Sequence, residues 1–237
     1  MMWRKSWWEC RFRVVCVALI YLSVSAGALL LLLNHGASAP PSARLNFYVI
    51  LLACLIAPIV TVLLAGSGIN SQTSWGMLHG FHASMYFLLS LPVSRRRALL
   101  IRSAMGGVFT ALFVVLSVCT ISLLALWSGT RIPPNQVLGR LPFILLGAFG
   151  LFGLSTLLTI VFDEFWAGML GVSIIGFFFG MEIAFQSLPI RFQPAEILSG
   201  QQFILTGAVG WPVIAFFFLL GVISMAASVY LVERKEY

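Results

Sequence analysis

Residues 141–162 read LPFILLGAFGLFGLSTLLTIVF, a stretch without a single Asp, Glu, Lys or Arg. An apolar helix of this length can cross the hydrocarbon core of a bilayer. Similar runs recur along the chain, and its composition is 60% hydrophobic and only 9% charged. Soluble domains are about half apolar and a quarter charged, so this chain has too much apolar surface to bury in water. The sequence predicts an all-α integral membrane protein.

Six such runs predict six transmembrane helices in one transmembrane domain, residues 1–237. The predicted spans are residues 14–33, 47–66, 99–127, 141–162, 167–187 and 208–232. The first run is long enough to span, so we expect it to be retained rather than cleaved as a signal peptide. Before it, residues 3–13 mix Trp with basic residues, which predicts an N-terminal interfacial helix lying in the membrane plane.

Basic residues flank these runs unequally. One side carries ten: Arg4, Lys5, Arg11, Arg13, Arg95, Arg96, Arg97, Arg102, Arg234 and Lys235. The other side carries four: Arg44, Arg131, Arg140 and Arg191. Loops rich in Lys and Arg stay in the cytoplasm, so both termini are predicted to be cytoplasmic. The same rule accounts for the net charge of +7, and we expect membrane lipid rather than nucleic acid as the surrounding partner.

The longest predicted cytoplasmic break is segment 67–98, between the second and third spans. Trp75, Leu78 and Met85 recur near helical spacing with polar residues between them, which predicts a short helix offering an apolar edge to a partner. Pro92 ends this helix, and Ser94 is the expected cap of the third span. Composition alone also fits an ordinary interfacial loop whose Arg cluster only sets the topology.

Residues 89–97, LSLPVSRRR, are similar to the "LSLPVSRR" signature of ABC-2-type transporter permeases, and they stand between the second and third of six spans, as in that family. Residues 8–13 (WECRFR) and the charged tail 231–237 resemble family termini more weakly. The resemblance implies a permease subunit of an ATP-driven exporter in the bacterial inner membrane. It further implies a homo- or heterodimer of permeases with separate ABC ATPase subunits, which bind the ATP and Mg.

In that family the ATPase contacts this cytoplasmic loop. The resemblance therefore implies a coupling segment that contains Gln72, Ser74, Trp75, Leu78, His79, His82 and Ser84, followed by a cytoplasmic basic anchor of Arg95, Arg96 and Arg97. Segment 67–98 contains no acidic residue, although many family members have some there. We therefore expect Trp75 and the two histidines, rather than salt bridges, to make the contact. The histidines have no nearby carboxylate or thiol, so no metal site is predicted.

The chain has no phosphate-binding G-x-x-x-x-G-K-[ST] motif, so we expect neither ATP hydrolysis nor a bound cofactor. Residues 198–202 (LSGQQ) resemble an ATPase signature but lie on the predicted outer side, where chance explains them. Two other classes of function stay open: an integral membrane enzyme acting on lipid, and a membrane scaffold that does not transport. An enzyme would need its catalytic groups near one interface, whereas the candidate carboxylates Asp163, Glu164 and Glu182 are predicted at opposite depths.

Glu182 is the one acid inside a predicted span, and Gln186 follows one turn later. A charge at the centre of a bilayer costs on the order of 3 kcal/mol on insertion scales. Glu182 must therefore face protein or water, or be protonated. Two interpretations are equally favoured: a substrate path or gate formed with Gln186, and a structural hydrogen bond between helices.

Small residues predict close helix packing. Gly147, Gly150 and Gly153 recur every third residue in the fourth span, and Gly176 and Gly180 form G-x-x-x-G in the fifth. Packing within one subunit is the favoured interpretation, with a dimer contact as the alternative. The four cysteines lie in or beside apolar runs without metal-site spacing, so we expect small packing residues rather than disulfides.

Overall fold

The structure is a computed structural model, and it describes residues 11, 14–23, 64–65, 94–127, 134–162, 169–171, 173–174, 176–177 and 210–234. Three long helices dominate this part of the chain: α5 (Arg95–Trp127), α6 (Pro134–Val161) and α10 (Trp211–Arg234). A shorter apolar helix covers Val14–Ser23. The described residues include no β-strand, which confirms the helical class for them.

Three of these helices are long and apolar enough to cross a membrane, over Arg96–Thr120, Leu138–Val161 and Trp211–Arg234. They correspond to the predicted third, fourth and sixth spans. The described helical residues of 14–23 lie in the predicted first span, and those of 169–177 lie in the predicted fifth. Only residues 64–65 of the second span, and only Arg11 of the interfacial helix, are described.

The start of α5 follows from a cap. The backbone N–H of Arg97 donates to Ser94 Oγ at 3.4 Å, and that of Ala98 donates to the Ser94 carbonyl at 3.1 Å. A Ser that satisfies the first free N–H groups of a helix is a favourable N-cap. The prediction for Ser94 is therefore confirmed. The helix begins one turn before the predicted boundary at Leu99, because the polar arginines are good helix formers.

The helix α6 begins before the predicted fourth span, and its part that is apolar enough to cross a membrane is Leu138–Val161. The helix begins at Pro134 rather than at Leu141, because proline suits the first turn of a helix, where its missing N–H has no partner to lose. Pro142 lies inside the helix and is exposed. Arg140, assigned above to an outer loop, is instead a helical residue whose side chain is only 5% exposed.

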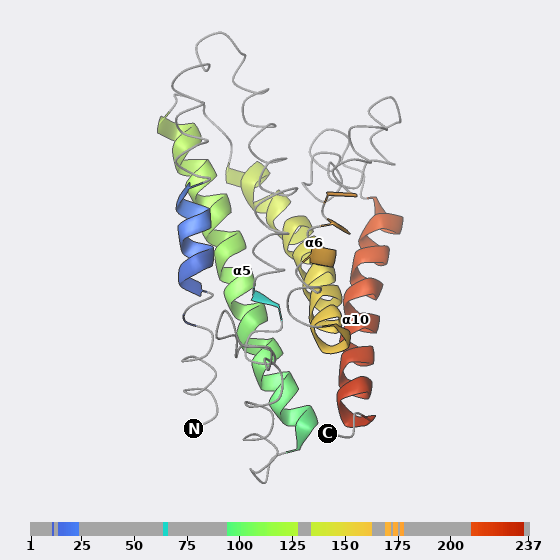
Figure 1. Ribbon diagram of the computed structural model, residues 1–237. Helices are drawn as coiled ribbons and strands as arrows, with labels where there is room; N and C mark the ends of the chain where they lie inside the picture. Colours follow the sequence, from blue (N-terminus) through green and yellow to red (C-terminus); the bar gives the residue numbers. More distant parts are fainter. Residues whose placement is uncertain are drawn as a thin grey trace.

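Contacts between the helices fix their relative directions. Leu99 of α5, Ile160 of α6 and Val232 of α10 share one buried cluster, whereas Phe113 of α5 packs with Ile144 of α6 in another. The start of α5 therefore lies beside the ends of α6 and α10. We call this the Arg95 end of the bundle and the opposite one the Trp127 end. Figure 1 shows α6 between α5 and α10, with the short helix Val14–Ser23 against α5.

Glycines bring α6 and α10 into backbone contact. A Cβ added at Gly153 would lie 2.7 Å from the carbonyl O of Gly221, and one at Gly150 would lie 2.7 Å from the carbonyl O of Phe217. This confirms that Gly150 and Gly153 pack within the subunit, and it identifies α10 as their partner. A Cβ at Gly176 would meet no atom within 4 Å, so the described chain shows no close packing against this glycine within the subunit. Gly180 lies outside the described residues, and the dimer contact stays a prediction.

The other side of the bundle is held together by side chains. Val17 of the first helix and Leu64 share a buried cluster with Phe113 and Val114 of α5. The hydroxyl of Tyr21 donates to Thr120 Oγ1 of α5, and it also lies 3.3 Å from the carbonyl O of Leu116. The helix Val14–Ser23 therefore runs in the same direction as α5, since Val17 meets the middle of α5 and Tyr21 its later part.

Candidate functional site

The Arg95 end of the bundle carries exposed positive charge. Arg96 and Arg97 project from the first turn of α5 and are exposed, and that turn contains no acidic residue. The N-terminus of a helix carries a partial positive charge, so cations there are locally unfavourable by about 0.3–1 kcal/mol each. Two residues of the predicted basic anchor, Arg96 and Arg97, are thus accessible, and helix stability does not explain their position. An anionic surface outside the helix would explain it.

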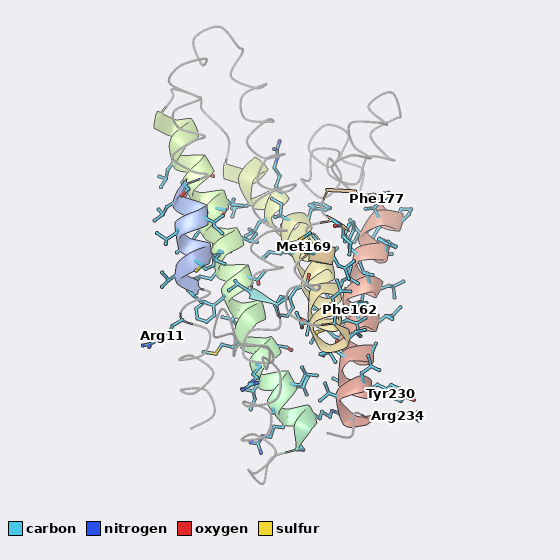
Figure 2. All side chains as sticks on the ribbon, in the orientation of Figure 1. Arg11, Phe162, Met169, Phe177, Tyr230 and Arg234 are labelled. Atoms are coloured by element: carbon cyan, nitrogen blue, oxygen red, sulfur yellow. The ribbon has the colours of Figure 1, made fainter. Side chains whose placement is uncertain are left out.

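Two more cations lie at this end. Arg234, in the last turn of α10, places its guanidinium carbon 4.5 Å from the centre of the exposed Tyr230 ring. Arg11 is also exposed, and Figure 2 shows it toward the same end of the view as Arg234. Tyrosine favours the membrane–water interface, and arginine favours the anionic cytoplasmic leaflet. The arrangement is therefore typical of a bundle rim at the headgroup level.

Sequence reasoning missed the burial of two arginines. Arg102 was grouped with the exposed basic residues, yet its side chain is 4% exposed between the bundle's helices. Arg140, near the Trp127 end, is buried to a similar extent in α6. Charged side chains within a membrane-spanning helix usually face the bundle interior. A signal was available for Arg102, which stands within apolar, helix-forming sequence, but not for Arg140, which follows the polar and proline-containing residues 133–136.

A second missed feature is a set of buried hydroxyls inside the bundle. They come from all three long helices: Ser103, Thr110 and Ser117 on α5, Ser155, Thr156 and Thr159 on α6, and Ser224 and Ser228 on α10. Ser117, Thr156 and Ser228 each donate to the carbonyl one turn back in their own helix. Intrahelical bonds of this kind let a hydroxyl sit in an apolar bundle.

Most of the predicted site residues fall in parts of the chain that the structure leaves undescribed. These are the coupling residues Gln72, Ser74, Trp75, Leu78, His79, His82 and Ser84, together with Glu182 and Gln186. Of the nine-residue motif at 89–97, Ser94, Arg95, Arg96 and Arg97 are described, and they form the cap and first turn of α5. The structure thus places the end of the motif at the Arg95 end of the bundle, and the coupling segment stays a prediction.

Within the described ranges, no three His, Cys, Asp or Glu residues gather where they would hold a metal ion. Cys16 and Cys119 are free thiols, the first half-buried and the second exposed. No protein-family model matches the chain, and no curated protein is significantly similar to it. A functional assignment must therefore be argued from the residues of this chain.

Proposed function

We propose that this chain is the membrane-spanning permease subunit of an ABC exporter of the ABC-2 type. The observation that carries the proposal is the LSLPVSRRR motif at residues 89–97, standing where a break in the apolar pattern meets the third predicted span. Its last four residues form the cap and first turn of α5, in which Arg96 and Arg97 are exposed. In this proposal the Arg95 end faces the bacterial cytoplasm, and segment 67–98 is the surface that receives the ATPase.

The directions of the described helices support a six-span topology with both ends inside. In such a topology the first and third spans run one way and the fourth and sixth run the other. The helix Val14–Ser23 does run parallel to α5, and α6 and α10 are parallel to each other and antiparallel to α5. Because α6 and α10 are parallel, α6 ends at the Arg95 end and α10 begins at the Trp127 end. The segment between them must therefore cross the bundle an odd number of times.

The predicted fifth span would supply that crossing. Figure 2 shows Phe162, Met169 and Phe177 in succession, rising from α6 toward the level at which α10 begins. The described residues of 169–177 are helical, as a span would require. The distribution of charge agrees with this topology. The exposed arginines of the described chain are Arg11, Arg96, Arg97 and Arg234, and all of them belong to the side predicted to be cytoplasmic.

In the proposed mechanism, this chain forms the transport path and separate subunits hydrolyse ATP. The chain lacks a phosphate-binding motif, so partner ATPases must bind and hydrolyse ATP. Closure of two ATPases on ATP moves the coupling segment, and this motion is passed to the helix that starts at Ser94. ATP biases the bundle between inward- and outward-facing states only by the difference in its affinity for the two states. A dimer of permeases would enclose the substrate path.

Site-specific cross-linking tests this proposal. Single cysteines are introduced as Trp75→Cys and His79→Cys into the full chain after its native cysteines are replaced by alanine. A short thiol-to-amine cross-linker is applied in membranes of the native host, and the products are identified by peptide mass spectrometry. We expect a covalent product with a protein that carries both a phosphate-binding loop and an ABC signature.

Leu123→Cys is the matched control, because Leu123 is exposed but lies toward the Trp127 end of α5. It should give no ATPase product. Equal yields from Leu123→Cys and His79→Cys, or no ATPase product from either coupling position, would reject the permease assignment. A reporter fused after Tyr237 tests the topology separately: fluorescence of a cytoplasm-dependent reporter is expected, and activity of a periplasm-dependent phosphatase would contradict it.

A further inference from the structure

Two buried hydroxyls on α5 lack the intrahelical hydrogen bond that Ser117, Thr156 and Ser228 make. Ser103 Oγ and Thr110 Oγ1 are buried, with side chains 6% and 4% exposed, and neither has a hydrogen-bond partner. By contrast, Ser117 on the same helix donates to the Phe113 carbonyl at 2.7 Å. A buried polar group without a partner is unfavourable, and its presence calls for an explanation such as water or a second conformation.

Both hydroxyls lie on one face of α5. Residues seven apart in a helix are almost aligned, and Gly106 lies one turn from each of them on the same side. At Gly106 the neighbours come very close: an added Cβ would be 2.9 Å from the Leu64 carbonyl O and 3.1 Å from Cζ of Phe152. The buried ring of Phe152 thus covers the gap between the two unpartnered hydroxyls.

We propose that this face of α5 is a closed polar path. Ser103 and Thr110 take up water when α5 separates from its neighbours, and the ring of Phe152 over Gly106 is the gate that closes the path between them. The closed arrangement leaves both hydroxyls without partners, and the open one hydrates them. The two polar groups therefore lower the free-energy difference between the closed and open states.

The opposite side of α6 shows why the opening occurs at α5. There the backbones of Gly153 and Gly221 are in contact, and Ser228 is fully buried with its hydroxyl donating to the Ser224 carbonyl. No side chain can rotate away to separate two touching backbones. On the α5 side the Leu64 carbonyl O also lies close to Gly106, but the contact that α6 makes there is one phenylalanine ring, which a rotamer change can move.

Thiol reactivity measures the opening directly, because only a hydrated thiol ionises readily to the reactive thiolate. The full chain, with its native cysteines replaced by alanine, is reconstituted into liposomes as Ser103→Cys, Thr110→Cys or Ser228→Cys. A small charged thiol reagent is then added to both sides of the membrane. We expect both α5 cysteines to react about tenfold faster or more than Ser228→Cys, since Ser228 is at least as buried but belongs to α10, the helix held against α6 by the glycine contacts.

Removing the ring should open the path. In a Phe152→Ala background, the rates at Ser103→Cys and Thr110→Cys should rise by about tenfold, and the rate at Ser228→Cys should not change. Phe152→Leu replaces Phe152→Ala if the latter elutes as aggregate on size exclusion. The proposal is overturned if both α5 cysteines react as slowly as Ser228→Cys with and without the ring.

Removing the hydroxyl of Thr110 should favour the closed state of the path. Thr110→Val keeps the shape of the side chain but loses the hydroxyl, so the closed state is favoured. The reaction rate of Ser103→Cys should then fall about threefold or more, and an unchanged rate would contradict the role of Thr110. These experiments contain no ATPase. Their failure would leave the permease proposal intact, and failure of the ATPase cross-link would leave the gate intact.

Discussion

α6 meets α10 backbone to backbone, whereas it meets α5 through side chains. On the α10 side, Gly150 and Gly153 lie against the main chain of Phe217 and Gly221. On the α5 side, the ring of Phe152 fills the space above Gly106, and two hydroxyls nearby have no partner in the described chain. Small residues at a helix contact allow close approach and many van der Waals contacts. The difference suggests a rigid α6–α10 pair and a separable α5.

The most damaging change to this contrast is Gly153→Leu. Its Cβ would meet Gly221 at 2.7 Å from O and 2.9 Å from Cα, and main-chain atoms of a helix cannot move aside singly. We expect a loss of about 3 kcal/mol in the free energy of unfolding, at the upper end for overpacking. The measurement is thermal or denaturant unfolding of the chain in mild detergent, monitored by tryptophan fluorescence.

Gly176→Leu is the matched control for Gly153→Leu. Gly176 is a helical, exposed glycine in an equally apolar sequence, and a side chain there meets open space. It should unfold within about 0.5 kcal/mol of the parent chain. If Gly153→Leu proves as stable as Gly176→Leu, the two helices do not touch through their backbones and the rigid pair is wrong.

Gly106→Ala probes the α5 side and should cost less. The added Cβ would lie 2.9 Å from the Leu64 carbonyl O, which moves only with its backbone, and 3.1 Å from the end of the Phe152 ring, which can yield. We expect about 1 kcal/mol of destabilisation, near the lower limit for overpacking. The adjacent Gly107→Ala places its Cβ 4.0 Å from the same ring and should be almost neutral. Equal costs at Gly106 and Gly153 would remove the contrast between the two sides.

How much of this was predictable depends on the kind of interaction. The long helices follow from apolar runs, and the Ser94 cap follows from local backbone chemistry, so both could be predicted from sequence. The glycine pattern of the fourth span predicted close packing, but the partner helix is a tertiary property. At Gly176 a glycine of the same kind has no close neighbour in the described chain, because a small side chain permits an approach without requiring it.

The arginines show a second limit of sequence reasoning. Arg140 was taken as a mark of the outer loop because charges usually end a span, yet α6 begins six residues earlier and buries it. A bundle interior can hold a charge that lipid cannot, and this depends on neighbours that one sequence does not reveal. The same holds for Ser103 and Thr110, since whether a hydroxyl has a partner is decided by packing.

Tyr21→Phe tests how α5 is held on its other face. Tyr21 donates to Thr120 Oγ1, and Thr120 in turn donates to the Leu116 carbonyl at 2.9 Å. Hydrogen bonds between membrane helices average about 0.6 kcal/mol, and we expect that loss here. A double-mutant cycle with Thr120→Val should show that the two losses are not additive. Tyr230→Phe is the control, because Phe keeps the ring below Arg234 and should be neutral.

The smallest expected effect concerns the first turn of α5. Ser94→Ala removes the acceptor for the Arg97 N–H, whose bond is long at 3.4 Å, so we expect a cost of about 0.5 kcal/mol, at the low end for an N-cap. Ser94→Asp should restore or exceed the parent stability, because a carboxylate caps the helix and also offsets the exposed Arg96 and Arg97. Ser122→Ala, which removes only an intrahelical hydroxyl bond near the Trp127 end, should leave unfolding unchanged. If Ser94→Asp is less stable than Ser94→Ala, Ser94 is not the N-cap of α5. The helix that we propose to move would then have no fixed first residue at the Arg95 end.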